Sequence, residues 1–152
     1  MPIYLIRHAH AGTRHRRVDA PKRALSTRGR AQAAGVCDLL GTEPIGRLFS
    51  SPSRRCVETL EPLAALLGLP IETVPALDEG SSGKEAERFL SAHAGQNPAA
   101  CSHGDVIPKV LSRLRASGLR TGDDTVAATG SVWVLHVGGQ PAATGVYHPP
   151  AD

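Results

Sequence analysis

The chain of 152 residues is long enough to bury a core without disulfides or metal ions, so we expect one domain over residues 1–152. Its 20% charged and 41% hydrophobic residues exclude a disordered chain, and 3% aromatic residues argue against a stacking surface for nucleic acid polymers. The net charge is +3. However, residues 1–55 hold eleven Lys and Arg against three Asp and Glu, a net charge of +8, whereas residues 56–152 hold six against eleven, a net charge of −5. The basic half favours an anionic partner, although charge alone fits a solvated arginine-rich surface better.

The expected elements begin with a buried strand over residues 2–7, followed by a polar, basic loop over 11–24. A helix then starts with Ser26 or Thr27 as its N-cap and ends before Gly41, with apolar side chains recurring at helical spacing.

Residues 47–51 predict a short strand and residues 53–68 a second helix. Pro62 lies inside that helix, and we expect it to kink or split it because proline lacks the N–H that a helix needs. A third strand is expected over 70–75.

The second half of the chain predicts a helix over 84–94, a fourth strand over 99–102 and a helix over 106–116. Near the end, alternating apolar residues beside a Gly138-Gly139 turn predict a β-hairpin. The alternation of strands and helices favours an α/β fold with three α/β/α layers, a mostly parallel central sheet and an antiparallel edge.

Three of the expected strands end in residues that can carry chemistry. Arg7-His8 follows the first strand, Ser51 to Arg55 follows the second, and Ser102-His103-Gly104 follows the fourth. Ligands of such sheets bind beyond the carboxyl ends of the strands, so these residues are expected on one rim.

A phosphoryl group fits this set of side chains. Two arginines bind its oxygens, a neutral imidazole attacks phosphorus, and a second imidazole, protonated, stabilises the charge of the transition state. A carboxylic acid is then needed to protonate the leaving oxygen, and Asp78-Glu79 follow the third strand. Strand alternation is expected to turn these two neighbours to different sides.

These motifs resemble those of the histidine phosphatase (phosphoglycerate mutase-like) superfamily. The Arg-His-Gly signature appears as Arg7-His8-Ala9, the Ser-Pro-x-x-Arg-x-x-x-Thr element as SPSRRCVET, the Leu-x-Glu element as LDE, and Ser-His-Gly as Ser102-His103-Gly104. The resemblance implies the catalytic residues His8, Arg7, Arg55, Glu79 and His103, with His8 as the nucleophile and Glu79 as the proton donor.

Substrate contacts are expected from Ser102, Gly104 and Arg14. Arg14 stands where many members carry an asparagine that touches phosphate, and a solvated loop arginine is an equally good reading. Ala9 replaces the commoner glycine, which costs little if its backbone φ is negative. Arg54 is expected at the surface, and the remaining histidines are interpreted as surface or structural residues: His10, His15, His93, His136 and His148.

Within the superfamily the chain is most similar to small SixA-type phosphohistidine phosphatases and to the phosphatase-like C-terminal domain of mycobacterial MutT-type (Nudix) hydrolases. The second likeness rests on RGRAQA, RCVETLEPLAALLGL and GDVIP. The chain is too short to carry the capping insertions of larger members.

Other chemistries fit the sequence less well. No Asp, Glu or Cys stands at ligand spacing beside His8 or His103, so we expect no metal and no cofactor. No G-x-S-x-G surrounds Ser51 or Ser102, which argues against a serine nucleophile. The odd number of cysteines, without a C-x-x-C pair, predicts buried, reduced thiols, and with no leader or long apolar run we expect a cytoplasmic protein that does not bind membranes.

The expected function is a metal-independent phosphatase acting on a phosphorylated small molecule or phosphoprotein. The alternative is a phosphate-recognition or docking module of the same fold with little turnover, partnering for example a Nudix hydrolase. A mutase is less favoured, because the short chain leaves the site open. The sequence fits phosphohistidine on a protein, a nucleotide or a sugar phosphate as substrate equally well. It does not indicate the oligomeric state.

Overall fold

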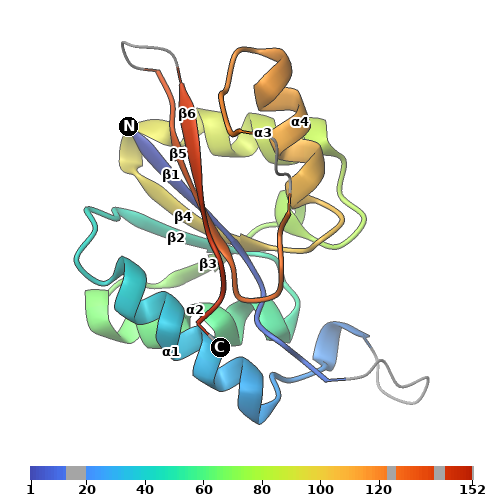
Figure 1. The fold of residues 1–152 in the computed structure, drawn as a ribbon. Coiled ribbons are helices and arrows are strands. Elements are labelled where there is room, and N and C mark those ends of the chain that lie inside the picture. The colour runs from blue at the N-terminus through green and yellow to red at the C-terminus, as the bar shows by residue number, and fades with distance from the viewer. Residues whose placement is uncertain (13–19, 123–125, 139–142, 152) are drawn as a thin grey trace.

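The computed structural model describes residues 1–12, 20–122, 126–138 and 143–151, and Figure 1 shows their arrangement in three layers. A six-stranded sheet in the order β3-β2-β4-β1-β5-β6 forms the middle layer. Its strands are β1 (Pro2–Arg7), β2 (Arg47–Ser50), β3 (Ile71–Thr73), β4 (Pro98–Ser102), β5 (Val132–His136) and β6 (Thr144–His148). Strands β1 to β4 run parallel and β5 is antiparallel to both β1 and β6, which confirms the expected fold class.

Two pairs of helices cover the two faces of the sheet (Figure 1). One pair is α1 (Thr27–Leu40) and α2 (Arg54–Leu67), and the other is α3 (Gly83–Ala92) and α4 (Ile107–Ala116). Short 3₁₀ turns stand at η1 (Ala20–Lys22), η2 (Pro75–Leu77) and η3 (Ala94–Gln96). None of the described helices has the length and apolar character needed to cross a membrane.

Side-chain alternation along the strands divides the core between the two faces. In β1, Ile3 and Leu5 pack with the buried side chains of α3 and α4, whereas Tyr4 and Ile6 pack with those of α1 and α2. Strand β1 is therefore buried on both sides, as expected for a central strand of a three-layer fold. Its last residue, Arg7, reaches the carboxyl end of the sheet from a strand that is packed on both faces.

The helix ends follow the expected local signals. Ser26 caps α1 by accepting a hydrogen bond from the Gly29 backbone N–H at 3.0 Å. Gly68 ends α2 with φ +66°, a left-handed conformation that favours glycine. Pro62 does not split α2, which is one helix over Arg54–Leu67, so of the two expected outcomes the split was wrong.

Two further expectations needed correction. The strand expected over 70–75 is shorter, because the chain turns into η2 at Pro75. The hairpin is confirmed, but its strands are joined by residues 137–143 rather than by a two-residue Gly138-Gly139 turn, and residues 139–142 of that connection lie outside the described part. Cys37, Cys56 and Cys101 are free thiols.

Candidate active site

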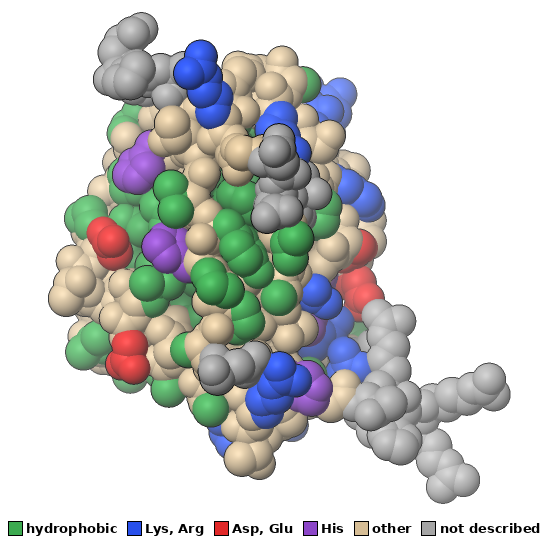
Figure 2. Space-filling model, in the orientation of Figure 1, with side chains coloured by type: hydrophobic (Ala, Val, Ile, Leu, Met, Phe, Trp, Pro, Cys, Tyr) green, Lys and Arg blue, Asp and Glu red, His purple; other side chains and the backbone are tan. Residues whose placement is uncertain are grey.

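A pocket of about 350 Å³ opens at the carboxyl ends of β1 and β4. The strand order sets these two strands side by side with β2 next to β4, so their last residues and the start of α2 meet on one rim. Figure 2 shows basic and histidine side chains gathered beside acidic ones on this part of the surface. The pocket is lined by Arg7, His8, His10, Ala11, Gly12, Arg23, Arg55, Glu79, His103, Gly104, Asp105 and Thr129.

His8 is fixed immediately after β1 and is 7% exposed. Its backbone N–H donates to the carbonyl of Ser102 at 3.0 Å, which ties the end of β1 to the end of β4. Its ring Nδ1 lies 2.8 Å from the carbonyl oxygen of Ala9. A carbonyl can only accept, so Nδ1 carries the hydrogen of the neutral ring and Nε2 keeps a lone pair.

The surroundings of His8 also keep its ring neutral. The pKa of His8 is lowered to about 3, and burial is the largest cause. The hydrogen bond to Ala9 opposes this shift, while the cations Arg55 and Arg7 and the His103 ring add to it. At neutral pH the imidazole is therefore an uncharged base with an available lone pair.

Arg7, the last residue of β1, contributes its guanidinium to the same pocket. Nη1 donates to the carbonyl of Ala127 at 2.6 Å, whereas the buried Nε finds no hydrogen-bond partner among the described residues. Burial lowers the pKa of Arg7, but a guanidinium keeps its charge at any working pH. A Cβ at Gly104 would lie 2.7 Å from Cζ of Arg7, so only glycine leaves room for this position.

Arg55 reaches the pocket from the first turn of α2 and is 1% exposed. Its Nη2 donates to Oε2 of Glu79 at 2.9 Å and to Nδ1 of His103 at 3.2 Å. The neighbouring Arg54 points to solvent with 57% of its side chain exposed and pairs with Glu58 at 3.2 Å. Arg55, not Arg54, therefore lies in the site.

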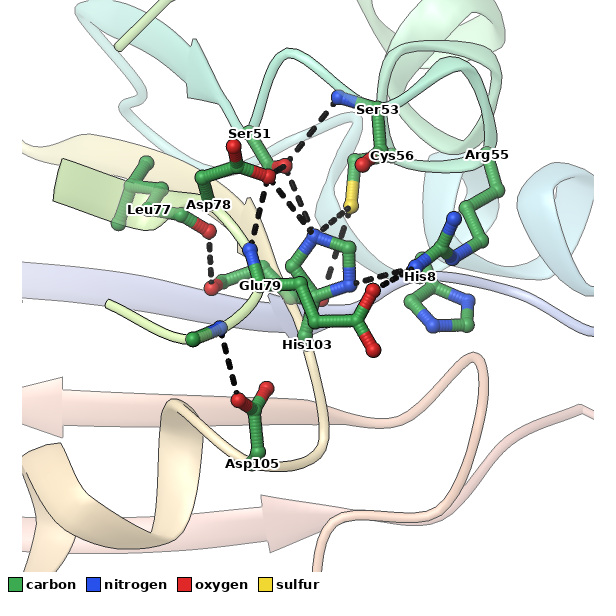
Figure 3. Close-up of polar contacts among 12 residues, drawn as sticks. His8, Ser51, Ser53, Arg55, Cys56, Leu77, Asp78, Glu79, His103 and Asp105 are labelled. Atoms are coloured by element: carbon green, nitrogen blue, oxygen red, sulfur yellow. Dashed lines mark hydrogen bonds and ion pairs between the residues drawn. The ribbon is translucent and has the colours of Figure 1, made fainter. Parts of the chain in front are cut away.

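His103 follows β4 and stands beside His8, with ring centroids 5.3 Å apart. Its Nε2 lies 2.8 Å from Oγ of Ser51 and 3.6 Å from Sγ of Cys56, both beneath the pocket. Figure 3 shows the ring with one edge toward Ser51 and the other toward Arg55 and His8.

Asp78 and Glu79 both face this cluster, which corrects the expectation that strand alternation turns them to opposite sides. They follow η2 rather than a strand, so the period of two does not apply. Asp78 accepts a hydrogen bond from Ser51 at 3.2 Å and Glu79 pairs with Arg55. Asp105 holds the same loop by accepting from the Gly80 N–H at 2.8 Å.

Of the three expected substrate contacts, Ser102 does not line the described pocket. Ser102 is fully buried and its hydroxyl donates to the carbonyl of Leu77 at 2.7 Å, so its role here is to fix the segment before Glu79. Arg14 lies outside the described residues. Gly104 lines the pocket.

Sequence reasoning missed several residues at the site. His10, interpreted as surface or structural, lines the pocket and its Nδ1 lies 2.7 Å from Oγ of Ser26. Thr59 accepts from the Ala9 N–H at 2.9 Å and donates to the Arg55 carbonyl at 2.6 Å, so it joins two motifs. Its place at the end of SPSRRCVET was a signal for this; Arg23, Asp105 and Thr129 gave none.

Among the described residues there is no group of three or more His, Cys, Asp and Glu side chains arranged to hold a metal ion. The two guanidinium groups beside His8 and His103 favour an anion at this position instead. A nucleophilic imidazole, two fixed cations and a carboxyl group around one cavity can bind and transfer a phosphoryl group.

The model of the histidine phosphatase superfamily (branch 1) matches residues 3–89. An 8-oxo-(d)GTP phosphatase of Mycolicibacterium smegmatis is 34% identical over 139 residues, or 88% of this chain, and the chain spans 43% of that relative's length.

Two solved structures show the same fold at low sequence identity. The protein histidine phosphatase SixA complexed with tungstate matches with a TM-score of 0.76 at 20% identity, covering 99% of this chain and 96% of that one. The alpha-ribazole phosphatase from Shigella flexneri matches with a TM-score of 0.66 at 17% identity, covering 95% and 94%. With the family match over more than half of its length, the chain belongs to the histidine phosphatase superfamily, branch 1.

Proposed function

We propose that the chain is a metal-independent phosphatase that hydrolyses phosphomonoesters or phosphohistidine through a covalent phosphohistidine on His8, within one domain over residues 1–152. The observation that carries the proposal is the state of the His8 ring. Its Nδ1–H donates a hydrogen bond to the Ala9 carbonyl, and its Nε2 lone pair is available. Its pKa of about 3 keeps the ring neutral between two guanidinium groups. A neutral ring nitrogen is the form that can attack phosphorus.

The phosphoryl group would lie against Arg7 and Arg55, with His103 beside it. The buried Nε–H of Arg7 has no acceptor among the described residues, and an oxygen of the phosphoryl group would supply one. Fixed donors of this kind stabilise the negative charge on the transferring group without reorganising during the reaction.

Glu79 is placed to become an acid only when substrate is present. In the free site its carboxylate is paired with Arg55 at 2.9 Å, which favours the ionised form. A phosphoryl dianion would compete for Arg55 and bring negative charge close to Glu79, and both changes favour a protonated carboxyl. The proton could then pass to the leaving oxygen.

The substrate class remains broad because different chemistries are named for the relatives on this fold. One is named for an oxidised guanine nucleotide, one for protein histidine and one for alpha-ribazole phosphate chemistry. We propose a phosphorylated small molecule or a phosphoprotein, selected by the residues around the pocket mouth.

The test is release of inorganic phosphate from nitrophenyl phosphate in the presence of a chelator, followed by acid-free quenching and mapping of the labelled residue. We expect label on His8, complete loss of turnover in His8→Ala, and full activity in the control His136→Ala, since His136 is exposed and remote from the pocket. Label on another residue would overturn the covalent step. Phosphate binding without turnover of any phosphoprotein, nucleotide or small phosphomonoester would favour the docking module instead.

A further inference from the structure

The two ring nitrogens of His103 have different partners, and these partners fix where its hydrogen lies. Nδ1 is 3.2 Å from Nη2 of Arg55, and a guanidinium can only donate. Nδ1 is therefore the acceptor, and Nε2 carries the hydrogen of the neutral ring. That hydrogen points to Oγ of Ser51 at 2.8 Å.

The Ser51 hydroxyl extends this series of hydrogen bonds from His103 toward Asp78, and its other partners allow only this direction of donation. It is fully buried, accepts from His103 Nε2–H and from the Ser53 backbone N–H at 3.2 Å, and donates its single hydrogen to Oδ1 of Asp78 at 3.2 Å. Both lone pairs and the hydrogen are used, so the reversed arrangement would leave the Asp78 bond without a donor.

Asp78 reaches His103 through this hydroxyl and not directly. Its Oδ1 is 4.0 Å from His103 Nε2, too long for a hydrogen bond, and it also accepts from the Glu79 backbone N–H at 2.8 Å. About half of the Asp78 side chain is exposed, so solvent screens its charge and its effect on the ring should be smaller than that of Ser51.

We propose that Ser51 and Asp78 are positioning residues that hold the His103 ring with its hydrogen on Nε2, its Nδ1 toward the phosphoryl group, and a carboxylate available to balance the ring's charge. This rests on the proposed phosphatase site. When phosphate engages Arg55, Nδ1 takes a proton from solvent and keeps it, so that the ring becomes a cation and its Nδ1–H donates a hydrogen bond to a phosphoryl oxygen. The Ser51 hydroxyl then accepts the hydrogen bond from Nε2–H at the buried end of the ring, and Asp78 accepts from the hydroxyl.

Other charged and titratable groups surround the same ring from every side. Arg7, Arg55 and the neutral His8 stand on the pocket side. The positive charge of the two arginines opposes a further cation at His103, while Glu79 and Asp105 favour it. From α2, Sγ of Cys56 lies 3.6 Å from the same Nε2 and is the one rival partner among the described residues. The shorter Ser51 contact assigns the hydrogen to the hydroxyl rather than to sulfur.

The first test reads the ring directly by ¹⁵N NMR of the free protein, so it does not depend on turnover. We expect a protonated Nε2 and an unprotonated Nδ1 in the wild type and in Ser53→Ala, the matched control. Ser53 is a buried serine two residues away whose side chain does not cap α2. Ser51→Ala should lose this single tautomer. A ring that is unchanged in Ser51→Ala but altered in Cys56→Ala would overturn the proposal.

The second test uses inorganic phosphate, with affinity read from the same ring resonances. We expect affinity to fall about tenfold in Ser51→Ala and two- to fivefold in Asp78→Asn, an exposed change that should not disturb folding. In the double variant, Asp78→Asn should have no further effect, because its path to His103 is already cut. Additive losses would contradict the chain of contacts. An inactive wild type that still shows the tautomer and this coupling would refute the proposed phosphatase activity while leaving the positioning roles standing.

Discussion

The floor and the rim of the pocket are built in different ways. The floor consists of His8, Arg55 and His103, which are 7%, 1% and 2% exposed, and the rim loop carries Asp78 and Glu79, whose side chains are 49% and 36% exposed. The floor follows the strands β1 and β4 and the first turn of α2, with backbone bonds that join neighbouring strand ends at 3.0 Å.

The rim loop depends on side-chain contacts instead. Asp105 accepts from the Gly80 N–H and Asp78 accepts from the Glu79 N–H, each at 2.8 Å, in a loop that follows a 3₁₀ turn. A rigid floor suits a phosphoryl group, which is common to all substrates, and a rim held by side chains suits the leaving group, which differs between them. Substitutions in the floor should therefore affect all substrates equally, and so should loss of a rim side chain that acts on the floor, whereas loss of the rim's proton donor should not.

The largest contrast is expected between two adjacent arginines. Arg55→Ala removes a buried guanidinium from the floor and should lower kcat for every phosphomonoester on the order of a hundredfold or more. Arg54→Ala removes only an exposed pair with Glu58, and kcat should stay within about twofold of wild type, with any change confined to the salt dependence of kcat/KM. Comparable losses of kcat from both would show that the floor does not contain Arg55.

The rim is tested by varying the leaving group. An alkoxide leaves poorly without a proton whereas nitrophenolate leaves well, so Glu79→Gln should lower kcat/KM for an alkyl phosphate by roughly tenfold or more and for nitrophenyl phosphate only slightly. Glu85→Gln, an exposed carboxylate on α3, is the matched control and should change neither rate. Equal losses on both substrates in Glu79→Gln would remove the proton-donor role from this residue.

The Asp78→Asn variant is not a neutral control for that experiment. Its carboxylate contacts Ser51 and lies within 4.0 Å of His103, so its loss should affect both leaving groups to the same small extent. A leaving-group-dependent loss in Asp78→Asn would instead assign the acid to Asp78.

Much of the floor was predictable because it follows strong periodic signals. The predicted buried strands and capped helices placed Arg7-His8, Arg55 and Ser102-His103-Gly104 together at the carboxyl ends of neighbouring strands. A motif that follows a strand lies where the sheet places the end of that strand. The choice of Arg55 over Arg54 came from the motif spacing, and the helix geometry of α2 turns only one of the two inward.

The rim was less predictable because its geometry depends on tertiary contacts. The strand expected over 70–75 becomes η2 at Pro75, so the alternation assumed for Asp78 and Glu79 was absent. Asp105 shows no distinctive spacing. Ser51 opens the motif SPSRRCVET, but the motif does not indicate which side chain the serine contacts. The bonds of these two residues to Gly80 and His103 exist only once α4 and β4 are packed.

An effect smaller than that of Arg55→Ala is expected from the glycine that borders the floor. In Gly104→Ala the new Cβ would lie 2.7 Å from Cζ of Arg7, and the flexible arginine can move away while the backbone stays in place. We expect KM to rise with a loss of about tenfold in kcat/KM at nearly unchanged thermal stability. Gly95→Ala is the matched control, because nothing lies within 4 Å of its added Cβ. Normal kinetics in Gly104→Ala would mean that the position of Arg7 is not critical.

The smallest effect tests whether the floor keeps His8 neutral. Its folded-state pKa of about 3 is below the ordinary value of 6.5, so between these pH values the unfolded chain binds a proton that the folded chain does not. Stability should therefore fall as pH decreases from 6.5 toward 3 and change no further from this group below that, with a slope of at most about 1.4 kcal/mol per pH unit. Other groups titrate in the same range. The quantity to measure is therefore the difference in the free energy of unfolding between wild type and His8→Gln, obtained by denaturant titration at several pH values from 3 to 6.5. His136→Gln, at an exposed position, should show no such slope. A wild-type minus His8→Gln difference that does not vary with pH would show that the pKa of His8 is the same in the folded and unfolded chain, and the claim that the pocket keeps the ring neutral would be wrong.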